Sequence, residues 1–354
     1  MIFAKSLLTL NDGRTADTKE LWEIRRQEIL RILSENAYGY LPQDNITCRM
    51  EIKDSIKKCC SGHGVLHEVD FVMTSDKGEY TVPGHFFMPT SEGPHPLILL
   101  LNFRPDAYDR YYPAEEIIEN GFALISVCYH DINQDLQPDI SLGLGSILDL
   151  PDPLFRYGKI ALWAFAASRI LDSLEGFPSI DLSNAAIAGH SRLGKTALWC
   201  GANDTRFKFV LSNCSGCMGD AVNQVKHEGA ETIRDIQEKF PYWFCESFFK
   251  YRSEEELPYD QHWLMACIAP RFVCTAAAEK NLWADPISQQ LCCVGASEAW
   301  EIYGLKGFAG GEERLTVNKP SLEGHVGHAY RDGIHFLGRP DWLSYMAFIK
   351  QHLN

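Results

Sequence analysis

The chain has 354 residues, of which 45% are hydrophobic and 12% aromatic, enough to bury a large core without disulfide staples. Its formal net charge of −14 and the lack of a basic block disfavour a nucleic-acid partner, because phosphate binding depends on clustered Lys and Arg. No apolar run approaches the roughly 20 residues that cross a bilayer, so no membrane partner is expected.

Residues 1–80 are predicted to form one helix followed by antiparallel strands. Apolar residues recur at helical spacing from Thr18 to Asn36, with Thr18 as a possible cap. From there to about Tyr80 the pattern alternates, most clearly over residues 64–73. This alternation predicts an antiparallel strand or two, leading to a further strand at residues 82–88.

After Met88, short apolar runs alternate with longer helical stretches. Residues 96–103 and 122–129 are too apolar to alternate, as expected for strands covered by helices on both faces. A long helix is predicted at residues 157–174, and three more strands are predicted at residues 185–189, 207–212 and 272–277. This order predicts a mostly parallel central sheet in a three-layer α/β/α sandwich.

The alternation of predicted strands and helices is interrupted by one segment. Residues 221–262 are rich in aromatic and charged side chains, and we expect them to form a helical insertion over the active site. No internal repeat, low-complexity tract or linker is visible, so residues 1–354 are expected to form a single domain.

The most informative segment is residues 185–198, with the sequence AAIAGHSRLGKTAL. An apolar strand ends at Gly189, Ser191 follows at the apex, and a helix begins by Lys195. This order is typical of the nucleophile elbow of an α/β hydrolase, in which small residues allow a tight turn and the serine is left exposed. The usual Gly-x-Ser-x-Gly pattern is altered, because Gly194 comes one position late. A serine that only caps the helix is the alternative interpretation.

Similarity to one known family extends over most of the chain. It is carried by residues 8–13, Trp22, Arg25, Arg26 and residues 163–172, 189–195, 213–216, 240–245, 257–262, 268–271, 282–286 and 331–335, with Asp341 and Trp342. In these segments the sequence resembles the bacterial branch of the glucuronoyl esterases and, more loosely, acetyl xylan esterase-like sequences. The resemblance implies an α/β-hydrolase fold and a Ser-His-acid esterase. Such an enzyme cleaves the ester between 4-O-methyl-glucuronic acid on xylan and a lignin alcohol, without metal or organic cofactor.

A serine hydroxyl needs a histidine to take its proton, and in this fold that histidine lies on a late loop. His325, His328 and His335 are the candidates. His335 matches the family's catalytic position, in a Gly-x-His loop just before a final helix, and is the predicted base. His325 and His328 lack a nearby third ligand type and are interpreted as loop or core residues rather than metal ligands. His190 is interpreted as packing beside the elbow.

At the position of the acid, the third member of the triad, this chain differs from the fungal members of the family. Fungal members carry Glu where this chain has Cys214, and a thiol is a poor partner for an imidazolium ion. Asp285, which follows the strand at residues 272–277, is the predicted acid, since it keeps the chain order Ser, Asp, His. Glu279 and Asp220 are the alternatives.

Four further residues are predicted to contact the substrate or the developing oxyanion. The backbone amide of Arg192 falls in the oxyanion position, and the resemblance adds its guanidinium as a second donor; the alternative is a structural ion pair with a buried carboxylate. Lys195 resembles the family lysine that contacts sugar hydroxyls, and Trp283 resembles the tryptophan that packs on the uronate. Glu231, in the insertion, is a further candidate. Arg104-Pro-Asp106 replaces the Gly-Asn-His common in bacterial members, so this side of the pocket is expected to differ.

The leading prediction is therefore a serine esterase acting on glucuronoyl esters, with a uronic-acid ester or xylo-oligosaccharide as substrate. An acetyl xylan esterase or another carbohydrate esterase is the first alternative, because the same triad would serve. An inactive carbohydrate-binding relative is the second, because Cys214 replaces the acid.

Cysteine usage and the first residues bear on the compartment. The twelve cysteines lie mostly in apolar runs without the spacing of a disulfide framework, so buried thiols are expected. Met1 to Lys5 show no basic region followed by an apolar stretch, so no signal peptide is predicted. These features favour a cytoplasmic location; a secreted or periplasmic protein whose signal has been removed is the alternative.

Overall fold

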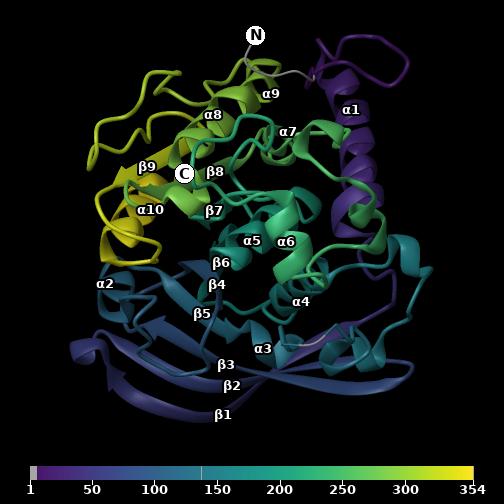
Figure 1. Ribbon diagram of the computed structural model, residues 1–354. Helices are drawn as coiled ribbons and strands as arrows, with labels where there is room; N and C mark the ends of the chain where they lie inside the picture. The colour runs from purple at the N-terminus through teal and green to yellow at the C-terminus, as the bar shows by residue number, and fades with distance from the viewer. Residues whose placement is uncertain (1–5, 137, 354) are drawn as a thin grey trace.

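The computed structural model describes residues 6–136 and 138–353; Met1 to Lys5, on which the signal-peptide prediction rests, lie outside the described residues. Within that part the strands form one sheet in the order β1-β2-β3-β5-β4-β6-β7-β8-β9 (Figure 1). The strands are β1 Thr47–Cys59, β2 Gly64–Ser75, β3 Gly78–Pro89, β4 His95–Asn102, β5 Ala123–Cys128, β6 Ile180–His190, β7 Phe209–Asn213, β8 Phe272–Ala278 and β9 Val326–Arg331.

The pairing of neighbouring strands changes once across this sheet, from antiparallel to parallel. β1, β2, β3 and β5 pair antiparallel, whereas β5, β4 and β6 to β9 pair parallel. The predicted antiparallel N-terminal part and the mostly parallel sheet are both confirmed. Because parallel strands point the same way, their carboxyl ends meet at one edge of the sheet, where α/β enzymes bind ligands.

The helices are α1 Lys19–Leu33, α2 Ala114–Glu119, α3 Tyr129–Ile132, α4 Lys159–Asp172, α5 Arg192–Asn203, α6 Ile233–Lys239, α7 Gln261–Ala266, α8 Pro286–Ala296, α9 Glu298–Glu301 and α10 Arg339–Gln351. Short helical turns are η1 Ser34–Tyr38, η2 Cys60–Gly62, η3 Gly143–Ile147, η4 Pro153–Phe155, η5 Glu246–Lys250, η6 Glu254–Glu256 and η7 Leu282–Ala284. Thr18 caps α1 as predicted, because its side chain accepts a hydrogen bond from the amide of Leu21. No helix of the described residues combines the length and the apolar character needed to span a membrane.

Both faces of the central strands are buried, which explains their continuous apolar runs. In β4, Leu97, Leu99 and Leu101 pack into a cluster with residues of α4, α5 and α8. The alternate residues Ile98 and Leu100 pack into a second cluster with residues of α2 and α10. Side chains alternate along a strand, so an all-apolar strand needs helices on both sides. The sheet therefore forms the middle of three layers, as predicted (Figure 1).

Two segments differ from the sequence-based expectation. The strand β9 was not predicted, and it carries His328 within the sheet rather than on a loop. The segment 221–262 contains α6, η5 and η6 joined by irregular chain, so helix accounts for less of it than expected.

Candidate active site

Ser191 stands at the junction of β6 and α5 in a strained backbone conformation. Its φ is 57° and its ψ is −125°, a combination that L residues adopt only when the surrounding chain enforces it. Two close approaches explain the glycines on either side. A Cβ on Gly189 would lie 2.0 Å from the carbonyl oxygen of Leu193, and one on Gly194 would lie 2.9 Å from Ser212 Oγ. The displaced second glycine therefore lets β7 and the residues after it, including Ser215, approach the start of α5.

His335 lies beside this turn, on the loop between β9 and α10. Its ring centroid is 4.5 Å from that of His190, the residue before Ser191. Arg331 holds the loop, because its guanidinium donates to the carbonyl oxygens of Ile334 and Phe336 on either side of the histidine. Burial lowers the pKa of His335 from 6.5 to about 4, and the positive charges of nearby Lys195, Arg192 and Arg331 add to the shift. His335 is therefore neutral at pH 7 and able to accept a proton.

The other candidate histidines occupy structural positions. His328 is fully buried in β9, with Nδ1 2.7 Å from Thr275 Oγ1 on the neighbouring strand. The ring of His325 stacks on Phe272, at the amino end of β8, opposite the edge that carries Ser191. His190 packs at the elbow, as predicted.

In the structure Asp285 pairs with His227 and not with His335, so the geometry does not support the prediction of Asp285 as the acid. The Asp285 carboxylate lies 2.8 Å from His227 Nδ1 and accepts a hydrogen bond from the amide of Ser288 in the first turn of α8. The physical reason is the backbone: Asp285 has a φ of 53°, which turns its side chain toward the start of α8, where a carboxylate is a favourable cap. The nearest partner of His335 Nδ1 is instead Asn281 Nδ2, at 2.9 Å.

Neither alternative acid contacts His335 within the described hydrogen bonds. Asp220 is fully buried and accepts hydrogen bonds from Ser212 Oγ and Gln289 Nε2, which brace the chain after β7. Glu279 continues the ladder between β8 and β9 through its backbone amide, which donates to the carbonyl of Arg331. Burial raises the pKa of the Cys214 thiol to about 12, so Cys214 stays neutral and cannot stabilise an imidazolium ion as a carboxylate would.

The guanidinium of Arg192 forms an ion pair with the buried carboxylate of Asp135. It also lies over the rings of Trp243, at 4.6 Å, and Phe240, at 4.9 Å, on the inserted segment. The ion pair with a buried carboxylate that the sequence offered as the alternative is therefore present, and a role of the guanidinium toward an oxyanion stays a prediction. The backbone amide of Arg192 opens α5, and the first amides of a helix have no acceptor within the helix, so it can donate to an oxyanion.

Three predicted substrate-binding residues come together next to this ion pair. Lys195 Nζ is buried and donates to the carbonyls of Ser215 and Cys217, at 2.5 and 2.6 Å, and to Glu231 Oε2 at 3.1 Å. These bonds use all three donors of the ammonium group, so Lys195 fixes Glu231 in place. The backbone amide of Glu231 donates to the carbonyl of Trp283, a residue that is 40% exposed. The Lys239 ammonium lies over the Trp283 ring, 4.4 Å from its centroid, and the exposed part of the ring suits the apolar face of a sugar.

Three residues of this site were not found by sequence reasoning. Asp135 lies in a loop that no local motif marks, and Trp243 lies in residues 240–245, which carry the family resemblance but were given no role. Asn281 stands two positions before Trp283 and was not predicted, because only carboxylates were considered as partners of the histidine. Among the residues that the structure describes, no cluster of three or more His, Cys, Asp or Glu side chains could hold a metal ion.

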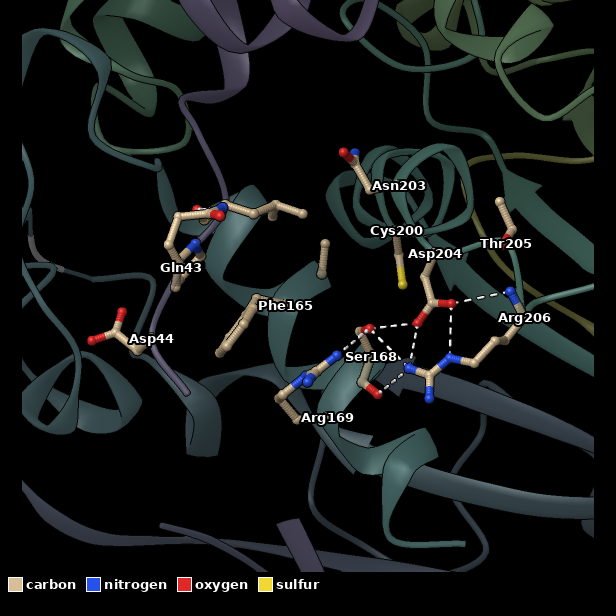
Figure 2. Close-up of a pocket in the computed structure, with 13 residues that line it drawn as sticks. Gln43, Asp44, Phe165, Ser168, Arg169, Cys200, Asn203, Asp204, Thr205 and Arg206 are labelled. Carbon is tan, nitrogen blue, oxygen red and sulfur yellow. Dashed lines mark hydrogen bonds and ion pairs between the residues drawn. The ribbon is translucent and has the colours of Figure 1, made fainter. Parts of the chain in front are cut away.

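A cavity of about 540 Å³ lies at the other end of α5 and is separate from this site (Figure 2). Its wall includes Cys200 in α5, which the rise of an α-helix places about 13 Å along the axis from Ser191. Figure 2 shows Ser168, Asp204 and Arg206 of this cavity bound to one another.

The match to known proteins decides the family. The sequence model described as "Glucuronyl esterase, fungi" matches residues 73–304, which include both β6 and α5 around Ser191. The chain belongs to the glucuronyl esterase family. The α/β-hydrolase fold and the resemblance found in the sequence are thereby confirmed.

Relatives and solved structures of glucuronyl esterases extend the comparison. Carbohydrate esterase MZ0003, from an unknown prokaryotic organism, is 36% identical over 247 residues, which are 68% of this chain and 56% of that protein. The 4-O-methyl-glucuronoyl methylesterase of Schizophyllum commune is 27% identical over 309 residues, 84% of this chain and 72% of that protein. The glucuronoyl esterase from Solibacter usitatus superposes with a TM-score of 0.89 at 29% identity and covers 99% of this chain and 97% of that one.

Proposed function

We propose that the protein is a serine carboxylic-ester hydrolase that cleaves glucuronoyl esters, with 4-O-methyl-glucuronic acid esters of the xylan–lignin type as its substrate class. The observation that carries the proposal is the positive φ of Ser191 together with the position of His335, whose ring centroid lies 4.5 Å from that of His190. The names of the Schizophyllum commune and Solibacter usitatus relatives support the substrate class.

The proposed chemistry uses Ser191 as nucleophile and His335 as general base. As Ser191 Oγ attacks the ester carbonyl, its proton passes to His335 Nε2, and the carbonyl oxygen becomes an oxyanion facing the backbone amide of Arg192. The C–O bond to the alcohol then breaks, and His335 returns the proton to the departing alkoxide. Water hydrolyses the acyl enzyme by the same steps. Within the described hydrogen bonds Ser191 Oγ does not yet contact His335, and such contacts often tighten only when substrate binds.

The uronate ring is proposed to rest on Trp283, beside the buried pair of Lys195 and Glu231. Lys195 has no donor left for a sugar hydroxyl, so Glu231 is the group that accepts one, and Lys195 holds its carboxylate at 3.1 Å. The cation of Arg192, fixed by Asp135, lies next to the same space.

Hydrolysis of benzyl glucuronate against acetylated xylan, with the full chain, tests the proposal. We expect release of benzyl alcohol, and loss of that activity and of fluorophosphonate labelling in Ser191→Ala. Ser344→Ala, a partly exposed position in α10, is the matched control and should behave as wild type. Hydrolysis of acetylated xylan alone would assign the protein to the carbohydrate esterases of the first alternative.

One observation favours a second candidate, an inactive carbohydrate-binding relative. The neighbour of His335 Nδ1 is an amide rather than a carboxylate, so the base lacks the usual charge partner. Xylo-oligosaccharide binding without either hydrolysis or labelling of Ser191 would establish this function.

The proposed site of action is a reducing compartment, on soluble uronate-bearing fragments. All twelve cysteines are free and eleven of them are buried. Titration of the thiols in protein purified without reductant should find all twelve reduced; disulfides would favour a secreted enzyme.

A further inference from the structure

Asn281 is tied to the loop of His335 through the main chain. It lies three positions after the end of β8 and is 5% exposed, and its backbone amide donates to the carbonyl of Ala278 at 3.0 Å. The β8–β9 ladder continues past both strands, because Glu279 N donates to Arg331 O at 2.9 Å and Lys280 N donates to Gly333 O at 3.0 Å. The position of the Asn281 side chain relative to His335 is thus set by backbone hydrogen bonds.

The groups that face His335 come from four parts of the chain. They are Arg192 and Lys195 of α5, Arg331 of β9, His190 at the end of β6, and Asn281 after β8. The charged members of this set are cations. The carboxylates nearby are each bound to one of those cations: Asp135 to Arg192, Glu231 to Lys195, and Asp341 to Arg331. Among the described residues, the hydrogen-bond partner of His335 Nδ1 is the Asn281 amide.

An amide can do the orienting work of the missing carboxylate. Asn carries an acceptor oxygen and a donor nitrogen, and rotation about its last bond exchanges them. With Oδ1 toward the ring, His335 Nδ1–H donates to it, and the lone pair of Nε2 is left for the proton of Ser191. Nδ2 then faces the Cys214 side chain, the second neighbour of this amide. Other hydrolases use a histidine with an asparagine in this way.

We propose that Asn281 is the positioning residue that fixes the tautomer and direction of the His335 ring, so that the site works with a serine, a histidine and an amide. The inference rests on the proposed function, since it assigns how the base of that reaction is held. An amide dipole orients the imidazole but stabilises the imidazolium ion less than a carboxylate does. The base therefore keeps a low proton affinity.

Two variants at position 281 separate orientation from a role in the turn alone. Asn281→Ala removes the partner, and kcat for benzyl glucuronate should fall about 100-fold, the lower end of a general base's contribution, with KM changed little. Asn281→Asp keeps the shape and adds a charge. Its carboxylate should raise the pKa of His335 and move the acidic limb of kcat/KM up by about one pH unit or more. Asn203→Ala, whose amide binds the Trp199 carbonyl in α5, is the matched control and should change neither quantity.

A spectroscopic measurement makes the test independent of turnover. The ring-nitrogen chemical shifts of His335 in isotope-labelled protein should report the Nδ1–H tautomer in wild type, and a mixture of tautomers in Asn281→Ala. Wild-type protein that shows this tautomer but neither hydrolyses the ester nor labels at Ser191 refutes the proposed function and leaves the orientation by Asn281 supported. An unchanged tautomer in Asn281→Ala, or an unmoved pH limb in a folded Asn281→Asp, overturns the inference.

Discussion

Replacement of Asp135 would measure how much the site depends on the ion pair of Arg192, the residue after Ser191. The Asp135 side chain is 1% exposed; one oxygen binds the Arg192 guanidinium, and the other accepts from Trp243 Nε1 at 2.8 Å. Asp135→Asn keeps the shape and an oxygen for the indole but removes the charge. Asp135→Ala removes both acceptors. The pair of variants therefore separates the charge from the hydrogen bonds.

The expected loss of stability follows from these contacts. A hydrogen bond to a charged group contributes about 1.5–3 kcal/mol, and Arg192 is 23% exposed, so water compensates part of its lost partner. We expect the free energy of unfolding to fall by about 2 kcal/mol in Asp135→Asn. The alanine variant also leaves a buried indole N–H without an acceptor, which adds about 1–3 kcal/mol.

The kinetic effect should accompany this loss, because Arg192 directly follows the nucleophile. A guanidinium released from Asp135 leaves the oxyanion side of the elbow, and kcat/KM for benzyl glucuronate should fall about 10- to 100-fold in Asp135→Asn. Urea unfolding followed by tryptophan fluorescence and initial rates provide the two measurements. Glu51→Gln, which breaks an exposed ion pair with Arg49, is the control and should alter neither. Wild-type kcat/KM and stability in Asp135→Asn would refute the reasoning.

Three more perturbations have defined outcomes. The acidic limb of kcat/KM in the wild-type enzyme should have its midpoint near pH 4, because His335, with a pKa of about 4, stays neutral above that pH; a midpoint above pH 6 contradicts this. Asp285→Asn should keep kcat within about threefold, and a large loss of kcat in this variant would instead identify Asp285 as the acid. Asp285→Ala should lower the midpoint of thermal unfolding, because α8 loses its N-terminal cap. Gly189→Ala should abolish fluorophosphonate labelling of Ser191, because the added Cβ would lie 2.0 Å from a backbone oxygen; normal labelling would show that the turn can adapt.

Features with a local physical cause were predictable from the sequence. The apolar runs in β4 and β5 follow from burial on both faces, and the order strand, Gly189, Ser191, helix follows from the close approach that only glycine allows. The strand β9 was missed because polar His328 and small Gly327 break its apolar pattern. His328 is accommodated by Thr275, on the neighbouring strand, which is distant in sequence.

The partner of His335 was missed for a different reason. Asn281 and Asp285 are four residues apart in one loop, and only the turn η7 between them decides which side chain faces the histidine. The positive φ of Asp285, which directs its carboxylate to α8, has no marker in the sequence. The charge of Asp285 made it the predicted partner of His335. The hydrogen bonds that extend the β8–β9 pairing instead bring the backbone of Asn281 next to the loop of His335.

The three cations that surround His335 affect the end of the proposed reaction more than its beginning. The ester is neutral, but the released uronate is an anion. The positive charges of Arg192, Lys195 and Arg331 act on His335, beside which the acid is proposed to form, even though each cation is paired with a carboxylate. Charge attraction inside a pocket exceeds that in water, so these groups retain the acid more tightly than the ester. Departure of the uronate would then limit turnover, and the free acid would act as a competitive inhibitor. Salt would speed the reaction, because it screens the attraction between the three cations and the uronate.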